Sequence, residues 1–358
     1  LFQDTKGFWW IGTNKRLYLY DEKNEVLRRV QLKIGNELID PDSNRIINQI
    51  GSEDILLGGS KVFLLNNPWS YILKNEPVKV EKKLLDLGEG NTINEYIKDG
   101  FGNHWFGSTD GIYRLVNEEG ELRVKNHITT FSETDKLLLD HNNIFTIHIN
   151  KNKDIWLGSF GGGLMKIQLN SVGVPEGIKS YHKKDGLPDE GIYGILEDEK
   201  GKLWLSTDMG ICRFDPLIEK FDVFDVNDGL INNNFRQSAH IKLKNGTMLM
   251  GGLNGLTIFD PEQIVPNEIT PKMSIAGLKI NNQRIMAGKE YNGRIILDKS
   301  IADTEKLVLD DSSRNISLDI IVKHSSAPKK NKIAYMLEGV NKDWIEIDGG
   351  KTTATYTN

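Results

Sequence analysis

Short polar segments at several points of the sequence carry side chains that could bind a hydroxyl-rich ligand. Each segment precedes a run of alternating hydrophobic residues. Amide, guanidinium and carboxylate groups can hydrogen-bond hydroxyls, and an arginine can form a paired bond with a carboxylate. Asparagine is also a common turn residue that bonds its own backbone, so a purely structural role remains open for this set. The candidate ligand-binding residues are Arg45, Asn91, Asn143, Glu190, Asn233 and Arg236.

Tryptophans are the second group with binding chemistry, because aromatic faces stack on ligands. One phrase repeats with its tryptophan at Trp10, Trp105, Trp156 and Trp204, and leucine replaces the tryptophan in two further copies. A position that leucine can fill indicates packing in an apolar core. Trp69 lies instead in a polar segment and is a candidate for an exposed ligand platform, although anchoring of its own loop is the favoured alternative.

No catalytic, metal-binding or cofactor-binding site is predicted. The run 150–154 alternates oxygen ligands like the start of a calcium loop, but it lacks the glycine and the terminal glutamate that complete such a site. The histidines include no pair at helical ligand spacing. Cys212 stands alone, which excludes an intrachain disulfide and a cysteine metal cluster.

A repeat must position these residues. The tryptophan phrase and its variants place their third residue at positions 12, 58, 107, 158, 206 and 251, so the copies are spaced by 45 to 51 residues. Such a period is typical of a four-stranded propeller blade. The sequence therefore predicts an all-β chain with six recognisable β-propeller blades over residues 1–262. The entrances of the innermost strands ring one mouth of a propeller, so the polar segments should converge there.

A second domain is predicted beyond the propeller. The proline-containing stretch 263–272 reads as a linker, since proline is excluded from central strands. Short alternating runs within 273–358 predict a small immunoglobulin-like β-sandwich. The composition is 38% hydrophobic with a net charge of -5, and it includes neither an apolar run that could cross a membrane nor a basic tract for nucleic acid.

Parts of the sequence resemble a known family. Residues 198–211 resemble the regulator-propeller repeat of bacterial hybrid two-component sensors, and 334–344 with 355–358 are similar to the triple-tyrosine domain that follows those propellers. The resemblance implies the periplasmic region of an inner-membrane protein, with part of a seven-bladed ring and a sandwich truncated at its C-terminus. It also implies an oligosaccharide ligand, a homodimer, and membrane attachment, a histidine kinase and a transcription regulator in segments outside this sequence. The chain itself is expected to be non-enzymatic and to contact no nucleic acid.

Two other functions remain open. Streptogramin lyases have similar glycine-tryptophan phrases on seven-bladed rings, and a protein-interaction propeller would share the fold. A lyase should place a histidine and a glutamate together at the mouth as base and acid. Glu190 is the only acidic residue of the polar segments, and none of them contains a histidine. A lyase also has no need of the second domain.

Overall fold

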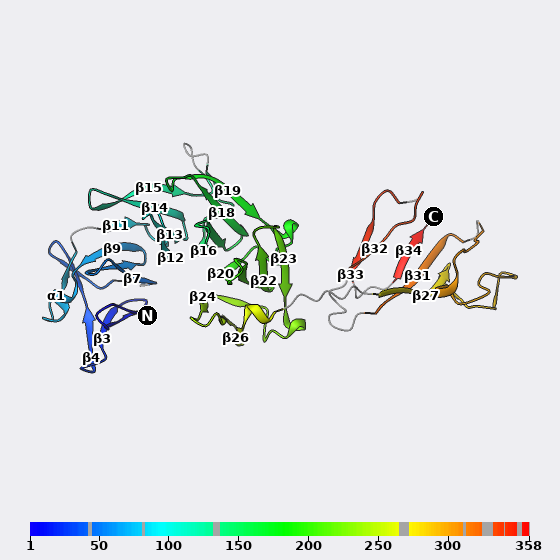
Figure 1. Ribbon diagram of the computed structural model, residues 1–358, viewed down its shortest axis with the longest axis horizontal. Helices are drawn as coiled ribbons and strands as arrows, with labels where there is room; N and C mark the ends of the chain where they lie inside the picture. The colour runs from blue at the N-terminus through cyan, green and yellow to red at the C-terminus, as the bar shows by residue number, and fades with distance from the viewer. Residues whose placement is uncertain are drawn as a thin grey trace. The chain divides into compact units, whose positions relative to one another are not determined.

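The structure, a computed structural model, describes residues 1–41, 45–80, 83–131, 137–264, 272–310, 313–323, 332–339, 341–348 and 353–357. It divides into two compact units, Leu1–Ile264 and Val265–Asn358 (Figure 1). Both are built from β-strands, which confirms the predicted all-β class; the one α-helix of the described residues is α1 (Trp69–Ile72). None of the described helices is long and apolar enough to cross a membrane. Most of the predicted linker lies outside the described residues.

The first unit consists mainly of six antiparallel sheets in chain order, five of four strands and a last one of three. The first three sheets are β1 (Phe2–Gln3), β2 (Trp9–Gly12), β3 (Leu17–Asp21) and β4 (Val26–Val30); β7 (Ile46–Ile50), β8 (Asp54–Gly58), β9 (Lys61–Asn66) and β11 (Lys83–Asp86); and β12 (Ile93–Lys98), β13 (His104–Ser108), β14 (Gly111–Glu118) and β15 (Glu121–Ile128). The other three are β16 (Ile144–Ile149), β17 (Ile155–Ser159), β18 (Leu164–Leu169) and β19 (Pro175–Tyr181); β20 (Ile192–Glu197), β21 (Leu203–Thr207), β22 (Gly210–Asp215) and β23 (Lys220–Phe224); and β24 (Phe235–Lys242), β25 (Met248–Gly252) and β26 (Gly255–Phe259).

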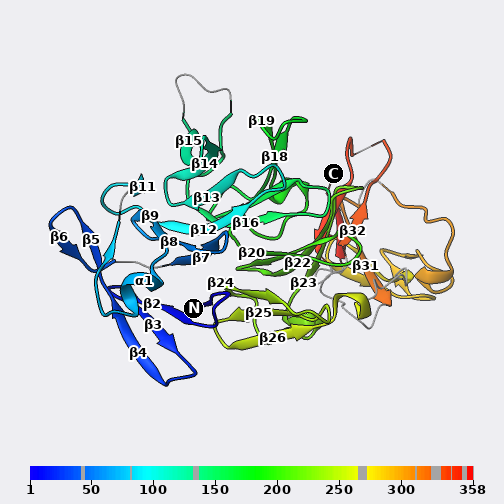
Figure 2. The same cartoon turned by 60° about the vertical axis from the view of Figure 1, so that its left-hand side comes forward.

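These sheets are arranged as propeller blades are. Figure 1 shows them fanned out with β7, β12, β16, β20 and β24 on the inner side and β15, β19 and β23 outside. β7, β12, β16 and β20 each contact the inner strand of the next sheet. Figure 2 shows the same sheets packed one against the next. The predicted period therefore corresponds to one four-stranded sheet per copy.

The repeated tryptophans hold each blade together from inside. Their exposed fractions are 0% or 1%, which confirms the prediction that they pack in the core. In the third sheet, Asp99 accepts the indole N–H of Trp105 at 2.8 Å and two backbone N–H groups of the turn between them. One aspartate thus shapes the turn and gives the buried indole its partner. Equivalent pairs are Asp4 with Trp10 and Asp198 with Trp204.

The glycine of the phrase lets the next blade approach. A Cβ atom at Gly158 would come within 2.7 Å of side-chain carbons of Ile192 and Thr146. At Gly107 it would come within 2.8 Å of Ile144. Both isoleucines begin the inner strand of the following sheet. The phrase therefore combines a tryptophan that fills the space between blades with a glycine that keeps their inner strands close.

The sequence repeat did not predict an insertion in two segments, one between the first two blades and one between β9 and β11 of the second blade. The two segments form a three-stranded sheet of β5 (Leu32–Ile34), β6 (Glu37–Ile39) and β10 (Val78–Lys79), in which β5 and β10 pair in parallel. Helix α1 belongs to the same insertion, and its residues Trp69 and Ile72 join the hydrophobic cluster of the first two blades. Single-turn 3-10 helices lie at Lys183–Asp185, Val226–Asp228, Pro261–Gln263 and Ile301–Asp303.

The second unit contains one four-stranded sheet and two hairpins in its described part. The sheet has the order β28 (Gln283–Ile285), β27 (Lys272–Ile280), β31 (Asn315–Lys323) and β34 (Thr353–Thr357). The hairpins are β29 (Glu290–Tyr291) with β30 (Arg294–Ile295) and β32 (Lys332–Tyr335) with β33 (Ile345–Asp348). Ile333 of the second hairpin packs with Ile320 and Ala354 of the sheet. Residues 306–309, one of the alternating runs within 273–358, form no strand.

Candidate ligand-binding site at the strand entrances

Five inner strands share a local feature where the chain enters them. Each begins with a buried residue: Ile46, Ile93, Ile144, Ile192 or Phe235. In three of them the register with the neighbouring strand shifts by one residue directly after that residue, and in β24 the pairing is irregular between Phe235 and His240. Such a bulge re-aims the side chain of the extra residue. The extra residues are Asn94, Phe145 and Tyr193, and Arg236 takes the corresponding position in β24.

Arg45, Asn94 and Asn143 come from three successive blades and form a hydrogen-bonded chain. The guanidinium of Arg45 donates to Oδ1 of Asn94 at 2.6 Å. Nδ2 of Asn94 donates to Oδ1 of Asn143 at 3.1 Å and to the backbone oxygen of Ile144 at 2.8 Å. The structure thus brings together two predicted residues through a third that the sequence reasoning missed. Arg45 is exposed and keeps further N–H donors for a ligand.

An exposed aromatic ring lies beside this chain. Phe160 directly follows β17, and its side chain is 56% exposed. Its ring meets those of Phe145 and His141 in edge-to-face geometry, with centroids 5.7 Å and 6.0 Å apart. Phe145 in turn stacks on Tyr193 at 5.3 Å. Neighbouring rings therefore hold Phe160 in place while more than half of it stays accessible.

Glycines fix the loop that presents Phe160. Gly163 has a φ of 67°, and a Cβ atom there would lie 2.2 Å from the backbone oxygen of Tyr181. A Cβ atom at Gly162 would lie 2.9 Å from the backbone nitrogen of His141. The sequence signal was therefore available: a phenylalanine followed by three glycines directly after the tryptophan phrase.

Tyr193 connects the aromatic cluster to charged groups. Its hydroxyl donates to Oδ2 of Asp208 at 2.6 Å. Burial and this carboxylate raise the pKa of Tyr193 to about 12, whereas the charge of nearby Arg236 acts in the opposite direction. Arg236 is exposed on β24 and, within the described residues, makes no hydrogen bond or ion pair. The hydroxyl of Tyr193 stays protonated at neutral pH and acts as a donor.

These contacts run from the second blade to the fifth, and Arg236 of the sixth blade lies near enough to Tyr193 for its charge to act there. Aromatic rings occupy the middle, amides one side, and an arginine lies at each end. Such a surface can stack on one face of a ligand and hydrogen-bond its rim. We call it the mouth arc: Arg45, Asn94, Asn143, Phe145, Phe160, Tyr193, Asp208 and Arg236.

Three other predicted residues bond their own loops. Asn91 donates to the backbone oxygen of Leu87 at 3.0 Å and accepts from Thr109 at 3.1 Å. Asn233 accepts the backbone N–H of Val226 at 2.9 Å. Glu190 accepts the backbone N–H of Lys183 at 3.0 Å. These contacts favour the structural alternative for these three residues.

The prediction of Trp69 as an exposed platform is wrong. Its side chain is 2% exposed, and its indole N–H donates to Oδ2 of Asp4 at 2.9 Å. The same carboxylate oxygen accepts the indole N–H of Trp10 at 2.8 Å. Trp69 begins α1 instead of lying in an open loop, so the inserted helix turns its ring into the core. Anchoring was the favoured alternative, and the structure places the residue accordingly.

A histidine does contact Glu190, although none occurs in the polar segments. Nδ1 of His182 lies 3.2 Å from Oε2 of Glu190, and Nε2 lies 3.3 Å from Oδ2 of Asp140. All three residues lie in links between blades. The bridge ties two links together beside the Phe160 loop, because the backbone oxygen of Glu190 accepts the N–H of Gly163 at 3.0 Å.

His148, His240 and the calcium-like run lie elsewhere. His148 lies 3.2 Å from Glu197, and burial lowers the pKa of His148. Burial also lowers the pKa of His240 to about 4. Asn150 accepts the backbone N–H of Asp154 at 2.8 Å, as in an ordinary hairpin turn. Among the described residues, no group of three or more histidine, cysteine, aspartate or glutamate side chains is arranged to hold a metal ion.

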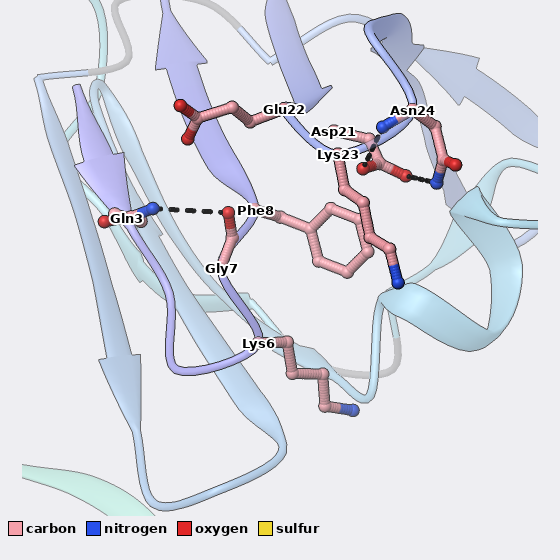
Figure 3. A pocket seen from close by; sticks show the side chains of 8 residues that line it. All are labelled: Gln3, Lys6, Gly7, Phe8, Asp21, Glu22, Lys23 and Asn24. Atoms are coloured by element: carbon pink, nitrogen blue, oxygen red, sulfur yellow. Dashed lines mark hydrogen bonds between the residues drawn. The ribbon is translucent and has the colours of Figure 1, made fainter.

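A second hollow lies far from the mouth arc. It has a volume of about 490 Å³ and is lined by turns of the first blade (Figure 3). Its polar groups bond one another: Gln3 donates to the backbone oxygen of Gly7, and Asn24 donates to Asp21. Glu22 accepts the indole N–H of Trp9 at 3.1 Å. This shallow hollow therefore offers few unsatisfied groups, and the mouth arc is the better candidate site.

Comparison with known proteins confirms the resemblance. The family model described as Two component regulator propeller matches residues 186–209. The chain is 24% identical over 285 residues to Histidine kinase P4 from Formosa agariphila. The aligned region covers 67% of this chain and 20% of that protein.

Solved structures show the same fold. The extracellular domain of a hybrid two-component system from B. thetaiotaomicron aligns with a TM-score of 0.68 and 21% identity, over 99% of this chain and 45% of that one. A second such domain from the same organism aligns with a TM-score of 0.56 and 18% identity, over 100% of this chain and 45% of that one. The chain thus spans less than half the length of these relatives. The chain shares the fold of these extracellular domains.

Proposed function

We propose that this chain is a ligand-sensing part of the extracytoplasmic region of a hybrid two-component histidine kinase, and that the mouth arc binds an oligosaccharide. The observation that carries the binding site is the exposed Phe160, framed by hydrogen-bonding groups from successive blades. The shared fold of sensor extracellular domains supports the class of protein.

The chemistry of a sugar matches that of the arc. A pyranose has C–H groups on its faces and hydroxyls around its rim, so it needs an apolar platform with donors and acceptors beside it. Phe160 supplies the platform. Arg45, oriented by Asn94, supplies donors, and Asp208 supplies an acceptor beside the hydroxyl of Tyr193. Because these groups come from different blades, a bound ligand would link the blades and stabilise one arrangement of them.

The ring would be completed by a further blade outside this sequence. Met248 and Met250 cover Trp204 of the fifth blade. The equivalent row of the sixth blade stays uncovered in the described structure, with Ile241 54% and Ile258 61% exposed. Such apolar sheet faces are normally buried. This exposed apolar face supports a seventh blade between the last sheet and the first, as in the seven-bladed ring of the family.

The remaining parts of the proposal concern the complete protein. We place the chain in the periplasm, with membrane attachment, histidine kinase and transcription regulator supplied by other segments. The second unit would be an immunoglobulin-like sandwich that relays ligand binding to the membrane, and a homodimer would be the signalling form. Each ligand-induced change requires different affinities for two arrangements of the protein.

A lyase has one observation in its favour, the bridge at His182. A histidine beside carboxylates is a familiar base. However, each ring nitrogen of His182 already has a carboxylate partner, so proton abstraction would require the bridge to open. Chromatography of sugars or depsipeptides incubated with the protein distinguishes the two functions, because a sensor leaves them unchanged.

Calorimetry of the natural extracytoplasmic region against an oligosaccharide panel tests the proposed site. We expect Phe160→Ala to weaken binding at least about fivefold, since central aromatic contacts contribute more than about 1 kcal/mol. Phe101→Ala is the matched control, because Phe101 is 42% exposed and lies at the opposite end of β12 from the entrance. Equal affinity of both variants would contradict the placement of the ligand on the mouth arc.

A further inference from the structure

The carboxylates near the middle of the mouth arc already have protein donors. Oδ2 of Asp208 accepts from the hydroxyl of Tyr193 at 2.6 Å. Oδ2 of neighbouring Asp189 lies 3.0 Å from the ammonium of Lys183, and its Oδ1 accepts the backbone N–H of Gly191 at 2.9 Å. A ligand therefore meets acidic groups whose charge the protein has partly compensated.

The two arginines of the arc have fewer protein partners than these acids. The guanidinium of Arg45 donates, within the described structure, to an amide oxygen, that of Asn94. Arg236 has no bonded partner among the described residues. Both residues are exposed and lie at strand entrances at opposite ends of the arc. Among the described residues, these two positive charges thus have no carboxylate partner.

The geometry points to an oligosaccharide that carries an anionic substituent, a carboxylate or a sulfate on a pyranose ring, with Arg236 binding the anion and Phe160 binding a sugar face. This inference rests on the proposed function and names the ligand class of the same site. Arg45 would bind a second anionic substituent, or hydroxyls, at the other end of the ligand.

Physical chemistry favours this assignment over a neutral sugar. A guanidinium binds a carboxylate or sulfate through two parallel N–H bonds, which are charge-assisted and stronger than bonds to hydroxyls. Arg236 also lies close enough to Tyr193 for its charge to act on the phenol. Tyr193 stacks on Phe145, which contacts Phe160. Two ring contacts therefore connect the phenol that feels the charge of Arg236 to the aromatic platform.

Trigalacturonate and its methyl ester are the first pair of probes, since they share the sugar framework and differ in charge. A chondroitin sulfate disaccharide and its desulfated form are the second pair and distinguish sulfate from carboxylate. Calorimetry on the natural extracytoplasmic region should show the charged member of at least one pair binding about tenfold or more tightly than the neutral member. That preference should shrink as the salt concentration rises.

Arginine variants locate the preference. Arg236→Gln should reduce the affinity for the charged probe about 10- to 100-fold and that for the neutral probe less than about threefold. Arg236→Lys should retain part of the preference, because it keeps the charge without the paired geometry. The control is Arg123→Gln, an exposed arginine of the outer strand β15. Unfolding midpoints of all variants should match, because these side chains are exposed.

The outcomes separate the two levels of the proposal. Equal binding of charged and neutral probes, with loss in Phe160→Ala, would overturn the anionic ligand and leave the oligosaccharide site standing. A charge preference that Arg236→Gln leaves intact would overturn the role of this arginine. Absence of binding to every probe would overturn both the ligand class and the proposed site.

Discussion

We expect Asp198→Asn to destabilise the propeller unit by about 2–3 kcal/mol. Asp198 is 3% exposed, and its Oδ2 accepts the indole N–H of Trp204 at 2.9 Å. Its Oδ1 accepts the backbone N–H groups of Lys200 and Lys202, both at 2.9 Å. Asparagine can keep the two backbone bonds through its oxygen. Its amide nitrogen then replaces Oδ2 and faces the indole N–H, donor against donor.

The magnitude follows from that one lost bond. A hydrogen bond to a charged group contributes about 1.5–3 kcal/mol, and a buried donor left without a partner costs about 1–3 kcal/mol. The two figures describe the same loss and are not added. For a unit of this size, 1 kcal/mol corresponds to about 2–4 °C, so the thermal midpoint should fall by about 4–12 °C.

A double-mutant cycle shows whether the indole bond is the cause. Trp204→Phe removes the N–H, so Asp198→Asn should cost less than about 1 kcal/mol in that background. Thermal unfolding, followed by tryptophan fluorescence and circular dichroism, measures both costs. If Asp198→Asn costs as much with phenylalanine present as with tryptophan, the bond to the indole does not hold this turn and our reasoning is wrong.

Three further predictions concern other positions. Burial lowers the pKa of His240 from 6.5 to about 4, so between these pH values the unfolded chain binds a proton that the folded chain excludes. The stability of the unit should therefore fall as the pH drops from 6.5 towards 4. His240→Gln should flatten this fall when thermal midpoints are measured against pH. Gly158→Ala should cost about 1–3 kcal/mol in thermal unfolding, because its Cβ atom would lie 2.7 Å from Ile192, whereas Gly100→Ala, with its nearest contact at 3.6 Å, should be tolerated. Trp69→Ala should lower the free energy of unfolding by about 3–5 kcal/mol yet leave the affinity for any oligosaccharide unchanged at temperatures where the variant is folded.

The blade repeat could be predicted because the residues that define it are close together in the sequence. The turn aspartate, the tryptophan and the glycine all lie within a few residues of one another, and each has one physical task. Asp99 and Trp105, for example, bond across six positions of sequence. Nothing in that local pattern signals the insertion with β5, β6 and β10, since its parallel pairing joins Leu32 to Val78 across three strands of the second blade. Trp69 likewise makes a long-range contact, its hydrogen bond to Asp4.

The fourth blade shows how far the local pattern determines the interior. Asn150 stands where three other blades have aspartate, and the indole N–H of Trp156 has no hydrogen-bond partner in the described structure. Nδ2 of Asn150 donates instead to Asp154 at 3.2 Å. The tryptophan stays 1% exposed without the bond, so apolar packing alone suffices to bury it. The aspartate therefore adds stability and turn geometry to a position that packing already fixes.

The same local reasoning located the strand entrances but missed most residues of the proposed mouth arc, and the bulges explain why. A regular strand alternates its side chains between two faces, so the residue after a buried isoleucine is expected to face the other neighbouring blade. The shift in register after Ile144 and Ile192 re-aims Phe145 and Tyr193 and leaves their rings stacked on each other. The polar residues just before them are then free to shape the links, as Glu190 does. Recognition is therefore expected at the residue after each entrance, where a side chain can change without disturbing the turn that positions it.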